Sequence, residues 1–178
     1  MPKVSIDKSD FYKNVIEMVK HARKSAYFYS ISCCWGFYSY GVRNFEHVMT
    51  AFRECAGTRW MGQHVDVRVL VRIDADNPID VFAADCLATM QANLARYISP
   101  GETPNLVREL IEPARIQFLI VDDQQVLSTH MQYDNFNREL GLALNVSESG
   151  SRFEKEDDLE EYHRLGKLFE AGDPAGIE

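Results

Sequence analysis

The chain has 178 residues, of which 46% are hydrophobic and 26% charged, and these near-average values exclude wholesale disorder. Its 19 lysines and arginines against 27 aspartates and glutamates give a formal net charge of −8. This charge argues against unaided binding to nucleic acid or to an anionic membrane, although a local basic patch is compatible with it. With no long apolar run and no apolar leader after Met1, we expect no membrane span and a cytoplasmic protein.

The length corresponds to one domain, which we place at residues 1–171 with a flexible tail at 172–178. In the first half, apolar residues at helical spacing predict helices over residues 11–22, 45–56 and 77–94. Between them, residues 26–34 and 65–73 are rich in aromatic and β-branched types and predict strands. This alternation is typical of crossover units between parallel strands.

The second half of the chain is richer in strands. After a polar loop at residues 99–104, short strands are predicted near residues 106–111, 115–121, 126–129 and 139–146. A last amphipathic helix is predicted over residues 153–169, with an acidic and solvated outer face. The order of elements therefore predicts an α/β fold, in which a mixed β-sheet is sandwiched between helices.

A cluster of aromatic residues follows the first predicted strand, where α/β folds often place ligand sites. It consists of Trp35, Phe37, Tyr38 and Tyr40. Such side chains can stack on bases or anchor a protein partner, or they can pack over the end of the sheet or in a dimer seam. Trp60 and Met61, next to Arg59, can extend such a patch.

The segment over residues 115–123, Arg-Ile-Gln-Phe-Leu-Ile-Val-Asp-Asp, resembles the signature of the phospholipase D-like superfamily. That signature is a histidine, any residue, a lysine, four mostly apolar residues and an aspartate. The apolar run and Asp122 match it, and Asn137 with Glu139 resembles the family's Asn-x-Glu on the next strand. The order of the upstream elements also agrees, so the resemblance covers nearly the whole chain and implies a phospholipase D-like half.

The residues that depart from the signature decide what the resemblance implies for function. Arg115 stands at the histidine position and Gln117 at the lysine position. In the family, the histidine forms a covalent phosphohistidine and the lysine helps to hold the phosphate oxygens. An arginine stays protonated and is a poor nucleophile, and a glutamine brings no charge. We therefore expect the family chemistry to be lost and the chain to act by interaction, without a metal or cofactor.

Two alternatives stay open at this stage: a phosphodiesterase or nuclease with a rewired active site, and a nucleic-acid-binding module that uses the aromatic cluster and nearby arginines. His130 lies where the family has a serine near the phosphate, so Arg115, His130 and Glu139 can form a rewired phosphodiesterase or nuclease site. Arg115 can instead clamp a phosphate as a binding residue, or pair with Asp122 or Glu139 in a structural role. The candidate ligand-binding residues are Arg115, Gln117, Asp122, His130, Asn137 and Glu139.

The resemblance also implies partners. The family's catalytic unit needs two signature copies that face each other, and this chain is long enough for one. A homodimer, or a heteromeric complex with a protein partner, is therefore expected. A phosphate-containing ligand or nucleic acid is a further possible partner, whereas a membrane is not expected.

Overall fold

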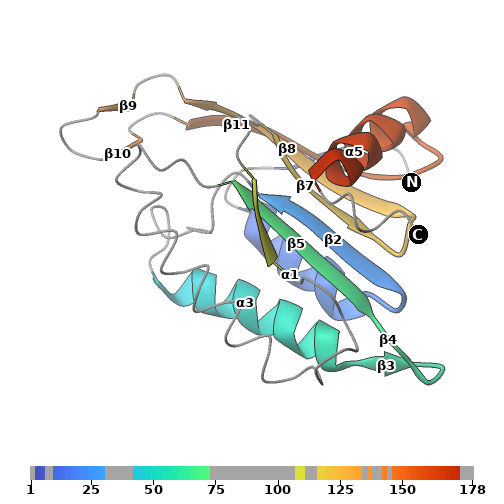
Figure 1. The fold of residues 1–178 in the computed structure, drawn as a ribbon. Helices are drawn as coiled ribbons and strands as arrows, with labels where there is room; N and C mark the ends of the chain where they lie inside the picture. Colours follow the sequence, from blue (N-terminus) through green and yellow to red (C-terminus); the bar gives the residue numbers. More distant parts are fainter. Residues whose placement is uncertain are drawn as a thin grey trace.

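The computed structural model describes residues 3–6, 10–30, 42–72, 107–110, 116–133, 136–137, 142–143 and 146–172. These residues form a seven-stranded mixed β-sheet with helices on both faces (Figure 1), which confirms the predicted fold class. The predicted helix at 77–94 and the loop at 99–104 lie outside the described residues. Among the described helices, none has the length and apolar character needed to cross a bilayer.

The strand order in the sheet is β1-β11-β8-β7-β2-β5-β6. Strands β2, β5 and β6 run parallel, whereas β7, β8, β11 and β1 pair antiparallel. The predicted change from crossover units to a meander is therefore confirmed. Their bounds are β1 Val4–Ile6, β2 Ser25–Ser30, β5 Asp66–Arg72, β6 Val107–Leu110, β7 Ile116–Val121, β8 Gln125–Tyr133 and β11 Val146–Glu154.

In the described part of the chain, three helices flank this sheet: α1 Phe11–His21, α3 Val42–Gly57 and α5 Leu159–Gly172. Two small hairpins complete the described chain. One pairs β3 (Arg59–Trp60) with β4 (Gln63–His64), and the other pairs β9 (Phe136–Asn137) with β10 (Leu142–Ala143).

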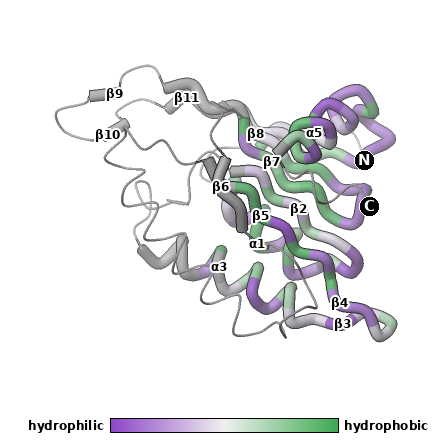
Figure 2. The backbone as a smooth tube through the Cα atoms, viewed as in Figure 1, coloured by the Kyte–Doolittle hydropathy of each residue, from purple (hydrophilic) through white to green (hydrophobic). Residues whose placement is uncertain are grey.

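The alternation of side chains along the strands creates two separate cores. On the face covered by α1 and α3, Phe28 of β2 stacks on Phe52 of α3, with ring centroids 5.5 Å apart. On the face covered by α5, Tyr29 of β2 stacks on Phe118 of β7 at 5.0 Å. In Figure 2 the hydrophobic colour follows the middle of the central strands, as expected for a sheet buried on both faces.

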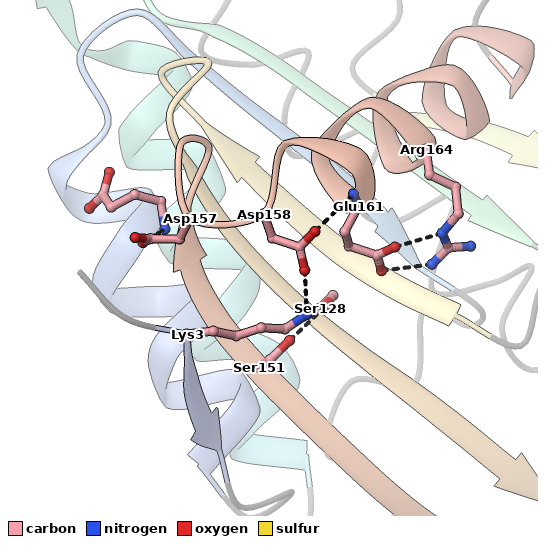
Figure 3. A network of polar contacts seen from close by, with 8 residues as sticks. Lys3, Ser128, Ser151, Asp157, Asp158, Glu161 and Arg164 are labelled. Atoms are coloured by element: carbon pink, nitrogen blue, oxygen red, sulfur yellow. Dashed lines mark hydrogen bonds and ion pairs between the residues drawn. The ribbon is translucent and has the colours of Figure 1, made fainter.

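The start of the last helix differs from its prediction. Phe153 belongs to β11, where it is 2% exposed and packs in the core under α5, and the helix begins only at Leu159. Asp158 sets this start, because its Oδ1 accepts the backbone N–H of Glu161 at 3.1 Å while its Oδ2 pairs with Lys3 at 2.7 Å (Figure 3). Part of the acidic outer face that was expected to be solvated therefore caps the helix and forms an ion pair.

The short strand β1, which the sequence did not predict, covers the outer edge of β11. Its three residues pair with residues 150–152 of β11. A Cβ added at Gly150 would lie 3.1 Å from the backbone oxygen of Ile6, so the glycine permits this close approach.

Candidate functional site

Strand β7 carries the described part of the signature segment, and its two ends lie at opposite ends of the sheet. At its first residue, Ile116 pairs with His130 of β8. Strand β2 runs antiparallel to β7 and ends at Ser30 near the same end, five residues before Trp35 in the sequence. We call this the Gln117 end of the sheet.

Gln117 is buried on the α1 side of the sheet, with 2% of its surface exposed. Its Nε2 donates a long hydrogen bond, 3.5 Å, to the hydroxyl of Tyr12 on α1. On β8, Gln117 lies directly opposite Thr129, which is 1% exposed and whose Oγ1 has no hydrogen-bond partner among the described residues. A neutral and incompletely satisfied polar pair therefore occupies the position where the resemblance places the phosphate-holding lysine.

The remaining predicted site residues are placed in part or not at all. The backbone of His130 lies on β8 opposite Ile116, and that of Asn137 on β9 opposite Leu142. Arg115 and Glu139 lie outside the described residues, as do Trp35, Phe37, Tyr38 and Tyr40 of the aromatic cluster.

Asp122 stands at the other end of β7, in the turn to β8, with a φ of 55°. Its Oδ1 accepts the backbone N–H groups of Lys24 at 2.6 Å and Ser25 at 3.0 Å, and both carboxylate oxygens accept that of Arg23 at 3.0 and 3.1 Å. The carboxylate therefore fastens the β7–β8 turn to the start of β2. We call this the Asp122 end of the sheet.

Other polar groups at the Asp122 end are paired as well. Asp123, with a φ of 60°, accepts a hydrogen bond from the Tyr162 hydroxyl and pairs with Lys155 at 3.0 Å, which ties the turn to α5. The Tyr27 hydroxyl donates to Asp66 at 2.7 Å. Burial, reinforced by the Asp66 carboxylate, raises the pKa of Tyr27 to about 12, so this tyrosine is neutral at physiological pH.

The part of the chain that the structure describes contains no group of three His, Cys, Asp or Glu side chains placed to hold a metal ion. Cys55 is buried in the core beneath α3, as its position on the apolar face of that helix predicts. Burial raises the pKa of its thiol to about 12, so the thiol is protonated at neutral pH and is a poor nucleophile.

The β3–β4 hairpin carries a contact that the sequence analysis missed. The Arg23 guanidinium lies over the ring of Trp60, 4.5 Å from its centroid. Trp60 and Met61 were considered only as extensions of the aromatic cluster at residues 35–40. Gly62 is the sequence signal for a tight turn at this place. Strands of two residues are too short to show an alternating pattern, so the sequence does not predict the hairpin.

Comparisons with known proteins give structural likeness only. No protein-family model matches the sequence, and a search of curated proteins found no match. Among solved structures, the chain is similar to TrmBL2, an archaeal chromatin protein, with a TM-score of 0.50 and 12% identity over 96% of this chain and 52% of that one. The chain thus spans about half the length of TrmBL2, and at this identity the likeness shows a shared fold alone.

Two further solved structures are similar to the chain. Nuc from Salmonella typhimurium, a phospholipase D family member, matches with a TM-score of 0.48 and 12% identity over 96% of this chain and 91% of that one. Phosphatidylserine synthase from Haemophilus influenzae matches with a TM-score of 0.49 and 16% identity over 85% of this chain and 33% of that one.

Proposed function

We propose that the chain is a catalytically degenerate phospholipase D-like domain that acts without catalysis, as an interaction or phosphate-ligand-binding subunit of a larger cytoplasmic system. The observation that carries this proposal is the state of Gln117. At the lysine position of the signature, it is a neutral side chain, 2% exposed, and hydrogen-bonded to Tyr12.

The chemistry of phosphodiester cleavage explains why this observation matters. The transferred phosphoryl group needs a nucleophile and cationic or hydrogen-bonding groups aimed at its developing charge. Gln117 offers an amide without charge, and Thr129 offers a hydroxyl without a partner in the described structure. With arginine in place of the nucleophilic histidine, such a site retains groups that hold a phosphate but lacks the group that attacks it.

We propose further that the subunit works as a homodimer or with a protein partner, because the resemblance covers a single signature copy. Light scattering of the purified chain tests the homodimer. Trp35→Ala and Phe37→Ala probe whether the aromatic cluster forms the seam. A monomer at every concentration would leave the heteromeric partner as the remaining form of the proposal.

A combined activity and binding assay tests the central proposal. Hydrolysis of bis(p-nitrophenyl) phosphate is expected to stay at the buffer rate. Inorganic phosphate is expected to raise the melting temperature, since a ligand at 100-fold its Kd stabilises a protein by about 2.7 kcal/mol. The shift should disappear in Arg115→Gln and persist in Arg164→Gln, which alters an exposed arginine on α5. Turnover above the buffer rate, or an unchanged phosphate shift in Arg115→Gln, would contradict the proposal.

The second candidate is a phosphodiesterase with a rewired site around Arg115, His130 and Glu139. The register of β7 and β8 supports this candidate, because His130 pairs with Ile116, the residue that follows Arg115. If phosphodiester hydrolysis is detected, His130→Ala should abolish it. Activity that survives this substitution would exclude the rewired site and point to another nucleophile or to a contaminant.

A further inference from the structure

The β3–β4 hairpin lies at the Asp122 end of the sheet (Figure 1), and it carries two large exposed apolar residues, Trp60 and Met61. Its turn is formed by Met61 and Gly62, with φ of 52° and 86°, the left-handed conformations that close a two-residue hairpin. Met61 is 91% exposed and Trp60 is 43% exposed. Among the described residues only Val4 and Leu159 are comparable, and neither lies beside another exposed apolar side chain of this size in the sequence.

The contact between Trp60 and Arg23 is held in place by the backbone on both sides. Arg23 is fixed at its own N–H by the Asp122 carboxylate. The hairpin is closed at its base by the bond from Val65 N–H to the Thr58 oxygen, at 3.2 Å. The indole is therefore presented with a guanidinium on one side while 43% of the residue stays open to solvent.

Basic residues belong to the hairpin and to the segment that contacts it through Arg23. Lys20 and His21 end α1, Arg23 and Lys24 follow, and Arg59 lies on the hairpin itself. The Asp66 carboxylate is paired with Arg68 at 3.0 Å, and the Asp122 carboxylate keeps its negative charge while it accepts three backbone N–H groups. Glu54 on α3 is the exposed carboxylate nearest in sequence to the hairpin. The stacking of Arg23 on Trp60 therefore joins the basic segment at residues 20–24 to the hairpin, in a protein of net charge −8.

We propose that this hairpin is a binding site for single-stranded nucleic acid, with Trp60 as the stacking platform. Exposed aromatic rings accept unpaired bases on their faces, and neighbouring arginines and lysines neutralise the phosphates. Arg23 lies over the ring, and Lys20, Lys24 and Arg59 are further basic residues of the same two segments; the Arg59 Nε also donates to His64 Nε2 at 3.1 Å. The site lies at the opposite end of the sheet from Gln117 and does not rest on the proposed function.

A fluorescence titration tests this site. The chain has two tryptophans, so in a Trp35→Phe protein Trp60 is the sole indole reporter. Addition of an oligothymidylate of about 12 nucleotides should quench this fluorescence, because a stacked base contacts the ring. Two or three phosphate contacts predict an affinity that falls roughly sevenfold to twentyfold between about 50 mM and about 200 mM salt.

Substitutions then locate the binding. Trp60→Ala and Arg59→Ala should each lower the affinity for a fluorescein-labelled oligothymidylate by about tenfold. Both change exposed positions of the hairpin, and melting curves establish that the variants are folded. Leu159→Ala and Lys167→Ala are matched controls, since they remove an exposed apolar and an exposed basic side chain from α5. These controls should bind like the parent protein.

Three results would overturn the proposal. One is an absence of quenching and of binding at the lower salt concentration. Another is binding that persists unchanged in Trp60→Ala and Arg59→Ala, which would place the nucleic acid elsewhere. The third is a blue shift of Trp60 fluorescence with phosphatidylglycerol vesicles but no response to the oligonucleotide, which would assign the hairpin to a membrane surface.

Discussion

The polar side chains at the two ends of β7 differ in the hydrogen bonds that they make. At the Asp122 end, one carboxylate accepts the backbone N–H groups of Arg23, Lys24 and Ser25. At the Gln117 end, the amide makes one bond of 3.5 Å, and the neighbouring Thr129 Oγ1 has no partner in the described structure. Both groups belong to the segment that resembles the phospholipase D-like signature, yet among the described residues only Asp122 accepts several hydrogen bonds.

Within this one motif, Asp122 therefore stabilises the fold, whereas the residue at position 117 is the one that bears on chemistry. An aspartate that satisfies three backbone donors cannot be exchanged without leaving those donors to find other partners. A residue at the Gln117 position is constrained by burial and by α1, but no backbone group depends on it in the described structure. The match at Asp122 is therefore explained by folding alone, whereas the departure at Gln117 bears on function.

The largest expected effect comes from restoring the charge at the Gln117 end. Gln117→Lys puts an ammonium group at a site that is 2% exposed. Burial of a lysine lowers its pKa by up to several units, so we expect a loss of about 4 kcal/mol in urea denaturation at pH 7. If the site adjoins a phosphate-binding groove, inorganic phosphate should recover part of this loss.

Ser128→Lys is the control for that experiment, because Ser128 is equally buried, 3% exposed, and bonds with Ser151 on β11 (Figure 3). It should be destabilised without any recovery by phosphate. A Gln117→Lys protein as stable as the parent would mean that the lysine reaches solvent, and the contrast between the two ends of β7 would then be weaker than the structure indicates.

The next largest effect is expected at the Asp122 end. Asp122→Ala removes the acceptor of three backbone N–H groups and leaves an alanine at a φ of 55°. We expect a loss of about 3 kcal/mol in the free energy of unfolding. Asp123→Asn, in the same turn, should lose about 1 kcal/mol, since its partners are the side chains of Lys155 and Tyr162. Equal losses would show that the turn is not anchored through Asp122.

A smaller effect, with a defined pH dependence, is expected at the start of α5. The hydrogen bond from Lys3, followed by the backbone N–H of Glu161, holds the pKa of Asp158 below its usual value. A carboxyl whose pKa is lowered by folding stabilises the protein above the unfolded pKa and loses this contribution as the pH falls through the folded pKa. The contribution is therefore present at neutral pH and fades below about pH 4.

Asp158→Asn isolates the charge in this contribution, because the amide oxygen can still accept the Glu161 N–H. The side chains of Lys3 and Asp158 are 47% and 28% exposed, so the pair is screened and the loss at pH 7 should be about 0.5 kcal/mol. Chemical denaturation at pH 7 and near pH 3 measures it. A difference between variant and parent that stays constant over this range would mean that the ion pair with Lys3 does not contribute.

The smallest expected change is a gain in the free energy of unfolding. Thr129→Val replaces the unpartnered hydroxyl with a methyl group in a strand, where valine is favoured. Removing a buried polar atom that lacks a partner should stabilise the protein by about 0.5 to 1 kcal/mol, visible as a higher denaturation midpoint. A loss of stability would show that the hydroxyl binds water or a ligand at the Gln117 end.

Most of the fold follows from patterns within single elements. Helical spacing located α1 and α3, and the runs of aromatic and β-branched residues located β2, β5 and β7. Strand β11 was hidden because Ser-Glu-Ser-Gly-Ser, residues 147–151, has low strand propensity, and its pairing with both β8 and β1 fixes it instead. Phe153 was assigned to the following helix for the same reason: pairing across the sheet is not visible in a local pattern.

The candidate site was less accessible to sequence reasoning than the fold. The sequence reveals the segment that contains Gln117 and Asp122. It does not reveal that the Asp122 carboxylate accepts hydrogen bonds from backbone N–H groups nearly 100 residues away in the sequence. The contacts of Gln117 with Tyr12, and of Trp60 with Arg23, likewise join distant segments through side chains with no motif in common. Whether Arg115, His130 and Glu139 share a groove stays a prediction.

The pairing of β1 with β11 has a practical consequence for handling the protein. Among the described residues, the three-residue strand β1 covers the outer edge of β11 along residues 150–152. Trimming residues 3–6, or displacing them with a bulky N-terminal fusion, would uncover a row of backbone donors and acceptors to which another chain can add. Preparations that lack this segment should therefore be prone to strand-mediated aggregation, and affinity tags are better placed at the C-terminus.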